Sequence, residues 1–133
     1  MPPEDTARVK LSALQSLLAG SIPVEVFLAG IHPDVDAYVQ ALRVHGGGVP
    51  IKFAEDADVV VGRAGFAHLC NLFAAGRMTA DELSFVADVM QLSDRVTFEE
   101  SWIGGAVAEC TDPEINGPLT IARARQLAAQ AVS

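Results

Sequence analysis

Apolar residues recur every three or four positions along most of the chain, the spacing that places them on one face of an α-helix. The first such pattern runs from Val9 to Leu18 and is followed by Gly20, a residue suited to the turn just past a helix end. Asp5 or Thr6 is suited to cap this helix at its start. The pattern therefore predicts a first helix that ends at Gly20.

Two further helices are predicted before a glycine triplet. A short helix follows Pro23, because proline suits the first turn of a helix, and a longer one opens at His32-Pro33-Asp34. The glycines at 46–48 end the longer helix, since each glycine in a helix interior costs about 1 kcal/mol relative to alanine.

The middle of the chain has a strand-like pattern instead. The runs 49–53 and 59–61 are rich in β-branched and aromatic residues and flank a polar segment, which predicts a small β-hairpin over residues 49–61. Pro50 restricts the first run to the edge or the start of a strand. Two strands alone are marginally stable, so the hairpin must pack against the helices.

The second half of the chain is predicted to be helical again. An apolar stripe over residues 66–73 ends at Gly76. Thr79 and Glu82 have the spacing of a capping box, in which each residue bonds the other's backbone N–H, and they start a helix that runs to about residue 92.

Two more helix starts follow. Thr97 and Glu100 repeat the capping box and are predicted to open a helix whose apolar face includes Trp102. The pair Gly104-Gly105 in its middle indicates either a break or a close approach by another backbone. Thr120 is predicted to cap a last helix that ends near residue 132.

Together these patterns predict a mainly α fold. We expect a single compact domain over residues 1–133, with about six helices and the small β-hairpin inserted after the third helix. Residues 17–23 and 73–79 share one order of features: apolar helix, glycine, apolar residue, new helix start. This echo predicts that the same helical hairpin is used twice.

The cysteines and the chain's start bear on the compartment. Cys70 and Cys110 lack a CxxC spacing and fall on predicted apolar faces, so we expect reduced core residues rather than zinc ligands or a disulfide. No stretch approaches the roughly 18 apolar residues of a membrane helix, and the first residues lack the basic and apolar regions of a secretory signal. The predicted compartment is the cytoplasm.

Negative charge is concentrated in one segment. Residues 79–116 hold nine acids and one base, whereas acids and bases cancel in the rest of the chain, so this segment accounts for the formal charge of −8. The acids are Asp81, Glu82, Asp88, Asp94, Glu99, Glu100, Glu109, Asp112 and Glu114. Such a field attracts basic partners and repels nucleic acid and anionic membranes, so neither of these is a predicted partner.

The acidic segment has two interpretations. Four of its acids fall in the first turns of predicted helices, where negative charge is stabilising, and the segment is then an ordinary solvated face. The scarcity of bases favours a functional interpretation, because self-repulsion costs stability. On that interpretation the partner-binding residues are Asp88, Asp94, Trp102, Glu109, Asp112 and Glu114. Core packing is the alternative role for Trp102.

No catalytic, cofactor-binding or metal-binding motif is identified. His32, His45 and His68 lack a ligand spacing, and His68 is rotated about 200° from Cys70 on a helix, although His32 or His45 could meet Cys110 in space. The glycine triplet lacks the lysine and hydroxyl of a phosphate-binding loop, so we interpret it as a flexible connection. The sequence therefore favours a protein that is not an enzyme.

Two helical turns suggest a family. Leu-Leu-Ala-Gly-Ser-Ile at 17–22 and Arg-Met-Thr-Ala-Asp-Glu-Leu at 77–83 occur in a small acidic chain. In these features, most clearly over residues 64–127, the chain resembles the immunity proteins of bacterial toxin systems. The resemblance implies a compact helical module that neutralises a basic protein partner through carboxylates and a few aromatic side chains.

Two alternatives stay open. A small-molecule-binding protein or enzyme would have its site under the hairpin, near Phe53, His45 and Cys110. A structural subunit would instead self-assemble into a homo-oligomer.

Overall fold

The computed structural model describes residues 9–45, 53–111 and 119–132. In this part of the chain the elements are α1 (Leu11–Leu18), α2 (Val24–His45), β1 (Val59–Val61), α3 (Arg63–Ala74), α4 (Ala80–Leu92), β2 (Val96–Phe98), α5 (Ser101–Glu109) and α7 (Ile121–Val132). They enclose one hydrophobic core, in which Phe66, Phe85 and Leu127 are fully buried. The prediction of a mainly helical single domain with about six helices and one small β element is confirmed.

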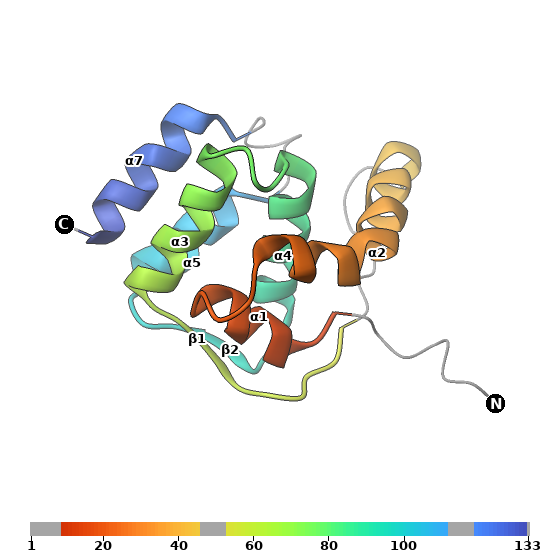
Figure 1. Ribbon diagram of the computed structural model, residues 1–133, viewed down its shortest axis with the longest axis horizontal. Coiled ribbons are helices and arrows are strands. Elements are labelled where there is room, and N and C mark those ends of the chain that lie inside the picture. The colour runs from red at the N-terminus through yellow and green to blue at the C-terminus, as the bar shows by residue number, and fades with distance from the viewer. Residues whose placement is uncertain (1–8, 46–52, 112–118, 133) are drawn as a thin grey trace.

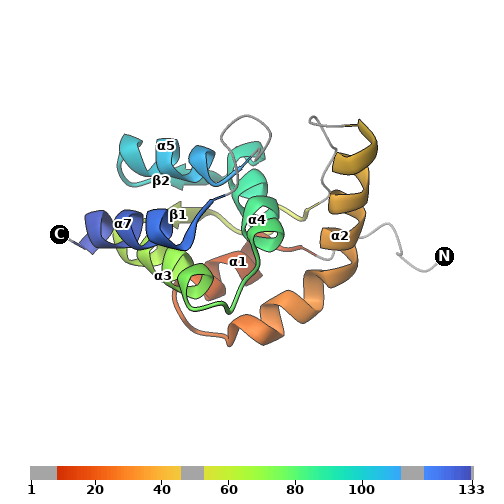
Figure 2. The ribbon, with the colours of Figure 1, turned by 90° about the horizontal axis from the view of Figure 1, so that it is seen from above.

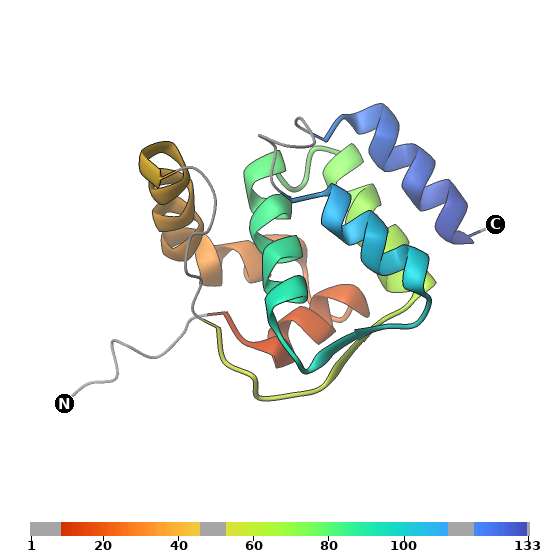
Figure 3. The same ribbon diagram turned by 180° about the vertical axis from the view of Figure 1, so that it is seen from behind.

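The helices are arranged so that α2 and α7 lie at opposite ends of the molecule (Figure 1). Helix α3 packs along α7 and against α1, while α4 contacts both α2 and α5. Seen from behind, α4 and α5 lie side by side on the face opposite α1 and α3 (Figure 3). Helices α4 and α1 therefore join α2 to the rest of the molecule.

The repeated helical turn is confirmed in detail. Gly20 and Gly76 have φ values of 72° and 77°, a conformation that glycine adopts without steric cost. The residue after each glycine donates its N–H to the carbonyl five positions earlier, from Ser21 to Ser16 and from Arg77 to Leu72, and both bonds are 2.9 Å long. The same turn therefore closes α1 and α3.

Two helix starts follow the predicted caps. At α4, the Glu82 N–H donates to Thr79 Oγ1 and the Thr79 N–H donates to Glu82 Oε1, which is the expected capping box. At α7, the Arg123 N–H donates to Thr120 Oγ1 over 3.0 Å. Both predictions rested on local sequence and both are confirmed.

The start of α1 differs from the prediction. The caps proposed for it, Asp5 and Thr6, lie outside the described residues, and α1 begins at Leu11. Its capping carboxylate comes from Asp56, which accepts bonds from both the N–H and the hydroxyl of Ser12. A cap supplied from so far along the chain leaves no local pattern in the sequence.

The second and third predicted helices form one helix. Helix α2 runs continuously from Val24 to His45 with Pro33 inside it, and it bends sharply in its middle (Figure 2). Proline lacks the N–H for the helical bond and its ring crowds the preceding turn, which accounts for a bend. The separate start predicted at His32 is therefore wrong, and the proline marks a kink.

The β element has a different pairing from the predicted hairpin. Strand β1 pairs with β2 in parallel, with Val59 opposite Val96 and Val61 opposite Phe98. Parallel strands need a long connection, and here α3 and α4 provide it. The strand at residues 59–61 is confirmed. The antiparallel pairing predicted for it is not the pairing observed, and its predicted partner strand falls mostly on residues 49–52, which lie outside the described residues.

The capping box predicted at Thr97 is also wrong. Thr97 lies in β2, and α5 begins at Ser101 with Glu100 in the capping position. Helix α5 is unbroken at Gly104-Gly105. A Cβ atom on Gly104 would lie 3.2 Å from the Phe98 ring, so this glycine allows a side chain, rather than another backbone, to approach closely.

Candidate functional site

A groove of about 550 Å³ opens between α2 and the first turn of α4. The α2 residues that line it recur at helical spacing along one face of that helix, and the α4 residues belong to its capped start. The lining consists of His32, Val35, Asp36, Val39, Gln40, Arg43, Thr79, Asp81 and Glu82. We take this groove as the candidate functional site and next consider how its walls are held.

The α2 wall is fixed by a buried polar contact with α4. The Tyr38 hydroxyl donates to Asp88 Oδ2 over 2.5 Å and lies 3.0 Å from the Ser84 hydroxyl. The Tyr38 ring also meets Phe85 edge-on, with ring centroids 5.3 Å apart. Because Tyr38 is flanked along the chain by groove residues, this contact sets the distance between the two walls.

The α4 wall is fixed by the capping box. The carboxylate of Glu82 is bonded to the Thr79 backbone over 2.8 Å, which holds its charge at the groove. Asp81, next to it in the first helical turn, is exposed. Both carboxylates also lie where the helix dipole stabilises negative charge.

The groove carries more negative than positive charge. Asp36, Asp81 and Glu82 contribute three carboxylates, against the guanidinium of Arg43. The imidazole of His32 lies 3.3 Å from Asp36, with both side chains about two-thirds exposed, at 67% and 66%. The valines of the lining add an apolar strip, so the groove combines carboxylates with a surface for hydrocarbon.

The predicted partner-binding residues do not gather in this groove. Asp88 is half-buried and accepts the Tyr38 hydroxyl, so its carboxylate contacts α2. Asp94 is exposed in the turn between α4 and β2. Asp112 and Glu114 lie outside the described residues.

Trp102 lies half-buried against the core. Its ring meets Phe66 edge-on at a centroid distance of 6.1 Å, and its indole N–H donates to Glu100 over 3.2 Å. These contacts account for the residue by packing, which was the alternative to a role at an interface.

Glu109 makes a two-pronged ion pair with Arg123 of α7. The two N–H···O distances are 2.6 and 2.9 Å. This bond holds the pKa of the Glu109 carboxyl below its usual value and raises the pKa of Arg123. Asp88 thus bonds to α2 and Glu109 to α7, two helices that lie at opposite ends of the molecule (Figures 1 and 2).

Other acids are also occupied by arginines far away in the sequence. Arg63 bonds to Glu100 and Arg77 to Glu25. The bond from Arg63 lowers the pKa of the Glu100 carboxyl, and that from Arg77 lowers the pKa of Glu25. Arg63 therefore offsets the charge of one acid of the segment 79–116, whereas Glu25 lies outside that segment.

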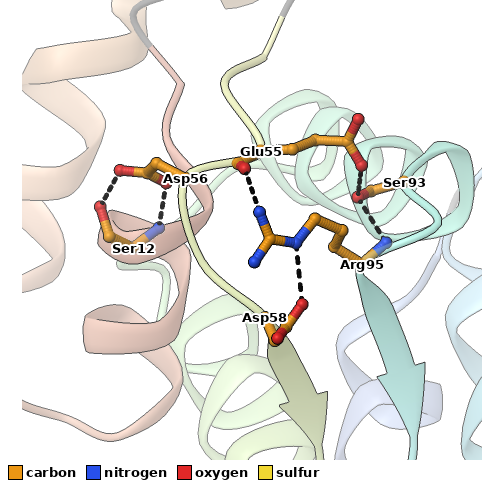
Figure 4. A network of polar contacts seen from close by, with 6 residues as sticks. All are labelled: Ser12, Glu55, Asp56, Asp58, Ser93 and Arg95. Carbon is orange, nitrogen blue, oxygen red and sulfur yellow. Dashed lines mark hydrogen bonds and ion pairs between the residues drawn. The ribbon is translucent and has the colours of Figure 1, made fainter.

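A further polar network fixes the segment before β1 (Figure 4). Arg95 donates to Asp58 Oδ1 over 2.8 Å and to the Glu55 carbonyl over 2.6 Å, while the Ser93 hydroxyl donates to the Glu55 carboxylate. The Arg95 bond lowers the pKa of Asp58, and the bonds from Ser12 lower the pKa of Asp56. These acids hold the segment against β2 and α1. This structural role explains their presence without a binding function.

Two residues of the alternative site under the predicted hairpin, Phe53 and Cys110, are described by the structure. Cys110 is buried, its thiol contacts the Ala106 carbonyl, and neither it nor Phe53 lines the groove. The side chain of His45 lies outside the described residues.

The cysteines behave as core residues, as predicted. Cys70 and Cys110 are free and buried, and burial raises the pKa of each thiol to about 12. Such thiols are poor nucleophiles because they stay protonated.

Comparisons of the chain with protein-family models, curated proteins and solved structures gave no match. None of the helices in the described ranges is both long and apolar enough to cross a membrane. Within the same ranges, no group of three histidine, cysteine or acidic side chains is placed to hold a metal ion.

Proposed function

We propose that this protein is an acidic protein-binding module that binds a basic protein partner. The observation that carries the proposal is the distribution of its charges. The chain has a formal charge of −8, and four of its arginines form ion pairs with its own carboxylates. The excess charge is left on other acids, many of them exposed.

Three exposed acids illustrate this excess. Among the described residues, Asp81 and Asp94 are exposed and form no ion pair. Glu99 is also exposed, and its charge adds to the bond from Glu100 in raising the pKa of the nearby Arg63. Exposed carboxylates without internal partners create a field that attracts positively charged proteins and raises their association rate. This is the property expected of a module that captures a basic partner.

The resemblance to bacterial immunity proteins supports a more specific form of the proposal. In that form the basic partner is a toxin, the module blocks it by binding, and both act in the cytoplasm.

The volume of the groove supports the alternative that the protein binds a small molecule. At about 550 Å³ it falls within the range of small-molecule sites. A small-molecule-binding protein would use the groove itself and not the region near Cys110. Thermal unfolding in the presence of a metabolite panel tests this alternative, since a ligand at 100 times its Kd adds about 2.7 kcal/mol of stability.

A capture experiment tests the main proposal. The tagged protein is used to retain partners from a native cell lysate at low salt, the wash is repeated at high salt, and retained proteins are identified. The proposal expects a basic protein that is held at low salt and weakened at high salt. Retention of only neutral or acidic proteins, insensitive to salt, contradicts it.

A further inference from the structure

We propose that the groove between α2 and α4 binds an arginine side chain of the partner, an inference that rests on the proposed function. It places one contact of the partner at the start of α4, away from the acids first predicted to bind. The groove's composition, the shape of an arginine side chain and the position of Arg43 support this assignment.

The composition of the groove matches the two parts of an arginine side chain. Arginine has a hydrocarbon stem that packs on apolar surface while its charged end stays among polar groups. The half-buried Val39 offers most of the apolar surface, with the nearly buried Val35 beneath it, and Asp36, Asp81 and Glu82 offer the carboxylates. A purely acidic surface would lack the first of these features.

The carboxylates come from two different helices, which favours arginine over lysine. A guanidinium carries five N–H donors in a planar fork and bonds more than one carboxylate at a time. Asp36 stands on α2 and the other two acids on the first turn of α4. A planar cation between the helices would contact both walls.

Arg43 sets which end of the groove takes the cation. It lies on the same face of α2 as Asp36 and seven residues further on, about 10 Å along the helix axis. Its positive charge repels a second cation, so the partner's arginine lies toward the Asp36 end. Removal of the Arg43 charge is then expected to strengthen binding. Nonspecific attraction of the arginine to one acid elsewhere would not predict an effect specific to Arg43.

The test uses a defined probe. A blocked Gly-Arg-Gly peptide is titrated into the ¹⁵N-labelled full chain, and the amide shifts in the NMR spectrum give both the Kd and the location of binding. The matched control peptide replaces arginine with citrulline, which keeps the shape and removes the charge. We expect saturable shifts in α2 and the first turn of α4 with the arginine peptide, and none with citrulline.

Charge-neutral variants then test the individual residues. Asp36→Asn, Asp81→Asn and Glu82→Gln are each expected to weaken binding about two- to five-fold, and Arg43→Gln to strengthen it by a similar factor. Glu82→Gln keeps a side chain that can complete the capping box. Glu25→Gln removes the same charge from an acid that pairs with Arg77 and does not line the groove, and it is expected to leave the Kd unchanged.

The outcomes separate this inference from the proposed function. Shifts that cluster around Asp94 and Glu99, equal binding of the citrulline peptide, or no saturable binding would overturn the groove assignment. If the captured basic partner is weakened by charge reversal at those outer acids but not in the groove, the assignment is wrong and the proposed function stands. If capture yields no basic partner, the proposed function itself is wrong.

Discussion

The contact that holds the groove open can be tested by removing one hydroxyl group. The substitution Tyr38→Phe deletes the donor of the 2.5 Å bond to Asp88 and the 3.0 Å contact with Ser84. It keeps the ring, and with it the edge-on contact with Phe85. Any change in stability therefore reports on the polar contacts and not on lost packing.

The expected loss follows from the nature of the acceptor. A hydrogen bond to a charged group contributes about 1.5 to 3 kcal/mol, and Tyr38 is only 3% exposed, so water does not readily replace its hydroxyl. With a urea dependence of about 1.5 kcal/mol per M, the unfolding midpoint should fall by about 1 to 2 M. Ser84→Ala removes only the neutral contact and should cost about 1 kcal/mol or less.

Urea unfolding followed by circular dichroism gives these midpoints. Hydrogen exchange adds a local measurement, because amides in the half of α2 after the bend should exchange faster in Tyr38→Phe while those of α1 change little. A midpoint within about 0.3 M of the parent protein, with unchanged exchange in α2, would refute the claim that Tyr38 positions the groove wall.

Three further predictions follow from the polar contacts and the buried thiols. Asp56→Ala should lower the melting temperature more than Asp56→Asn, which keeps an oxygen to cap α1; equal melting temperatures would contradict a capping role. Glu109→Gln should reduce stability by at most about 1 kcal/mol near pH 7, since its bond to Arg123 is partly exposed. That difference should shrink as the pH falls through the lowered pKa of Glu109, because the carboxylate stabilises the fold only while it is ionised; a difference that grows in acid would contradict the ion pair. Cys70 and Cys110 should resist a thiol reagent at pH 8 until the protein is unfolded in urea, since with a pKa of about 12 only about one thiol in ten thousand is ionised; rapid labelling of the native protein would contradict their burial.

Features set by neighbouring residues were predictable from the sequence. The capping box at Thr79, the cap at Thr120 and the glycine turns at Gly20 and Gly76 all depend on groups within six positions of one another. Their physical causes are local, so their patterns are visible in the chain.

Features that join distant segments were not predictable in the same way. Residues 96–98 are β-branched or aromatic and residues 59–61 are β-branched, which favours strands in both, but Thr97 also has a glutamate three positions later, the spacing of a capping box. Only the fold brings these runs together. Likewise, the α1 cap is supplied by Asp56, 44 positions after its donor Ser12.

The candidate site was missed for the same reason. Charge counted along the sequence placed the binding acids between Asp88 and Glu114, yet Arg123 neutralises Glu109 and Tyr38 engages Asp88. Two groove residues, Asp81 and Glu82, were attributed to helix capping alone. They become part of a candidate binding groove only because the fold brings α2 beside them.

The central claim, capture of a basic partner by an acidic surface, is tested most directly by association kinetics. The association rate constant of the captured partner is measured against salt concentration for the parent protein and for a variant with two charges reversed in the groove and two outside it: Asp36→Lys, Asp81→Lys, Asp94→Lys and Glu99→Lys. The account predicts a rate that falls steeply with salt for the parent, and a slower, flatter dependence for the variant. Equal rates and equal salt dependence for the two proteins would contradict it.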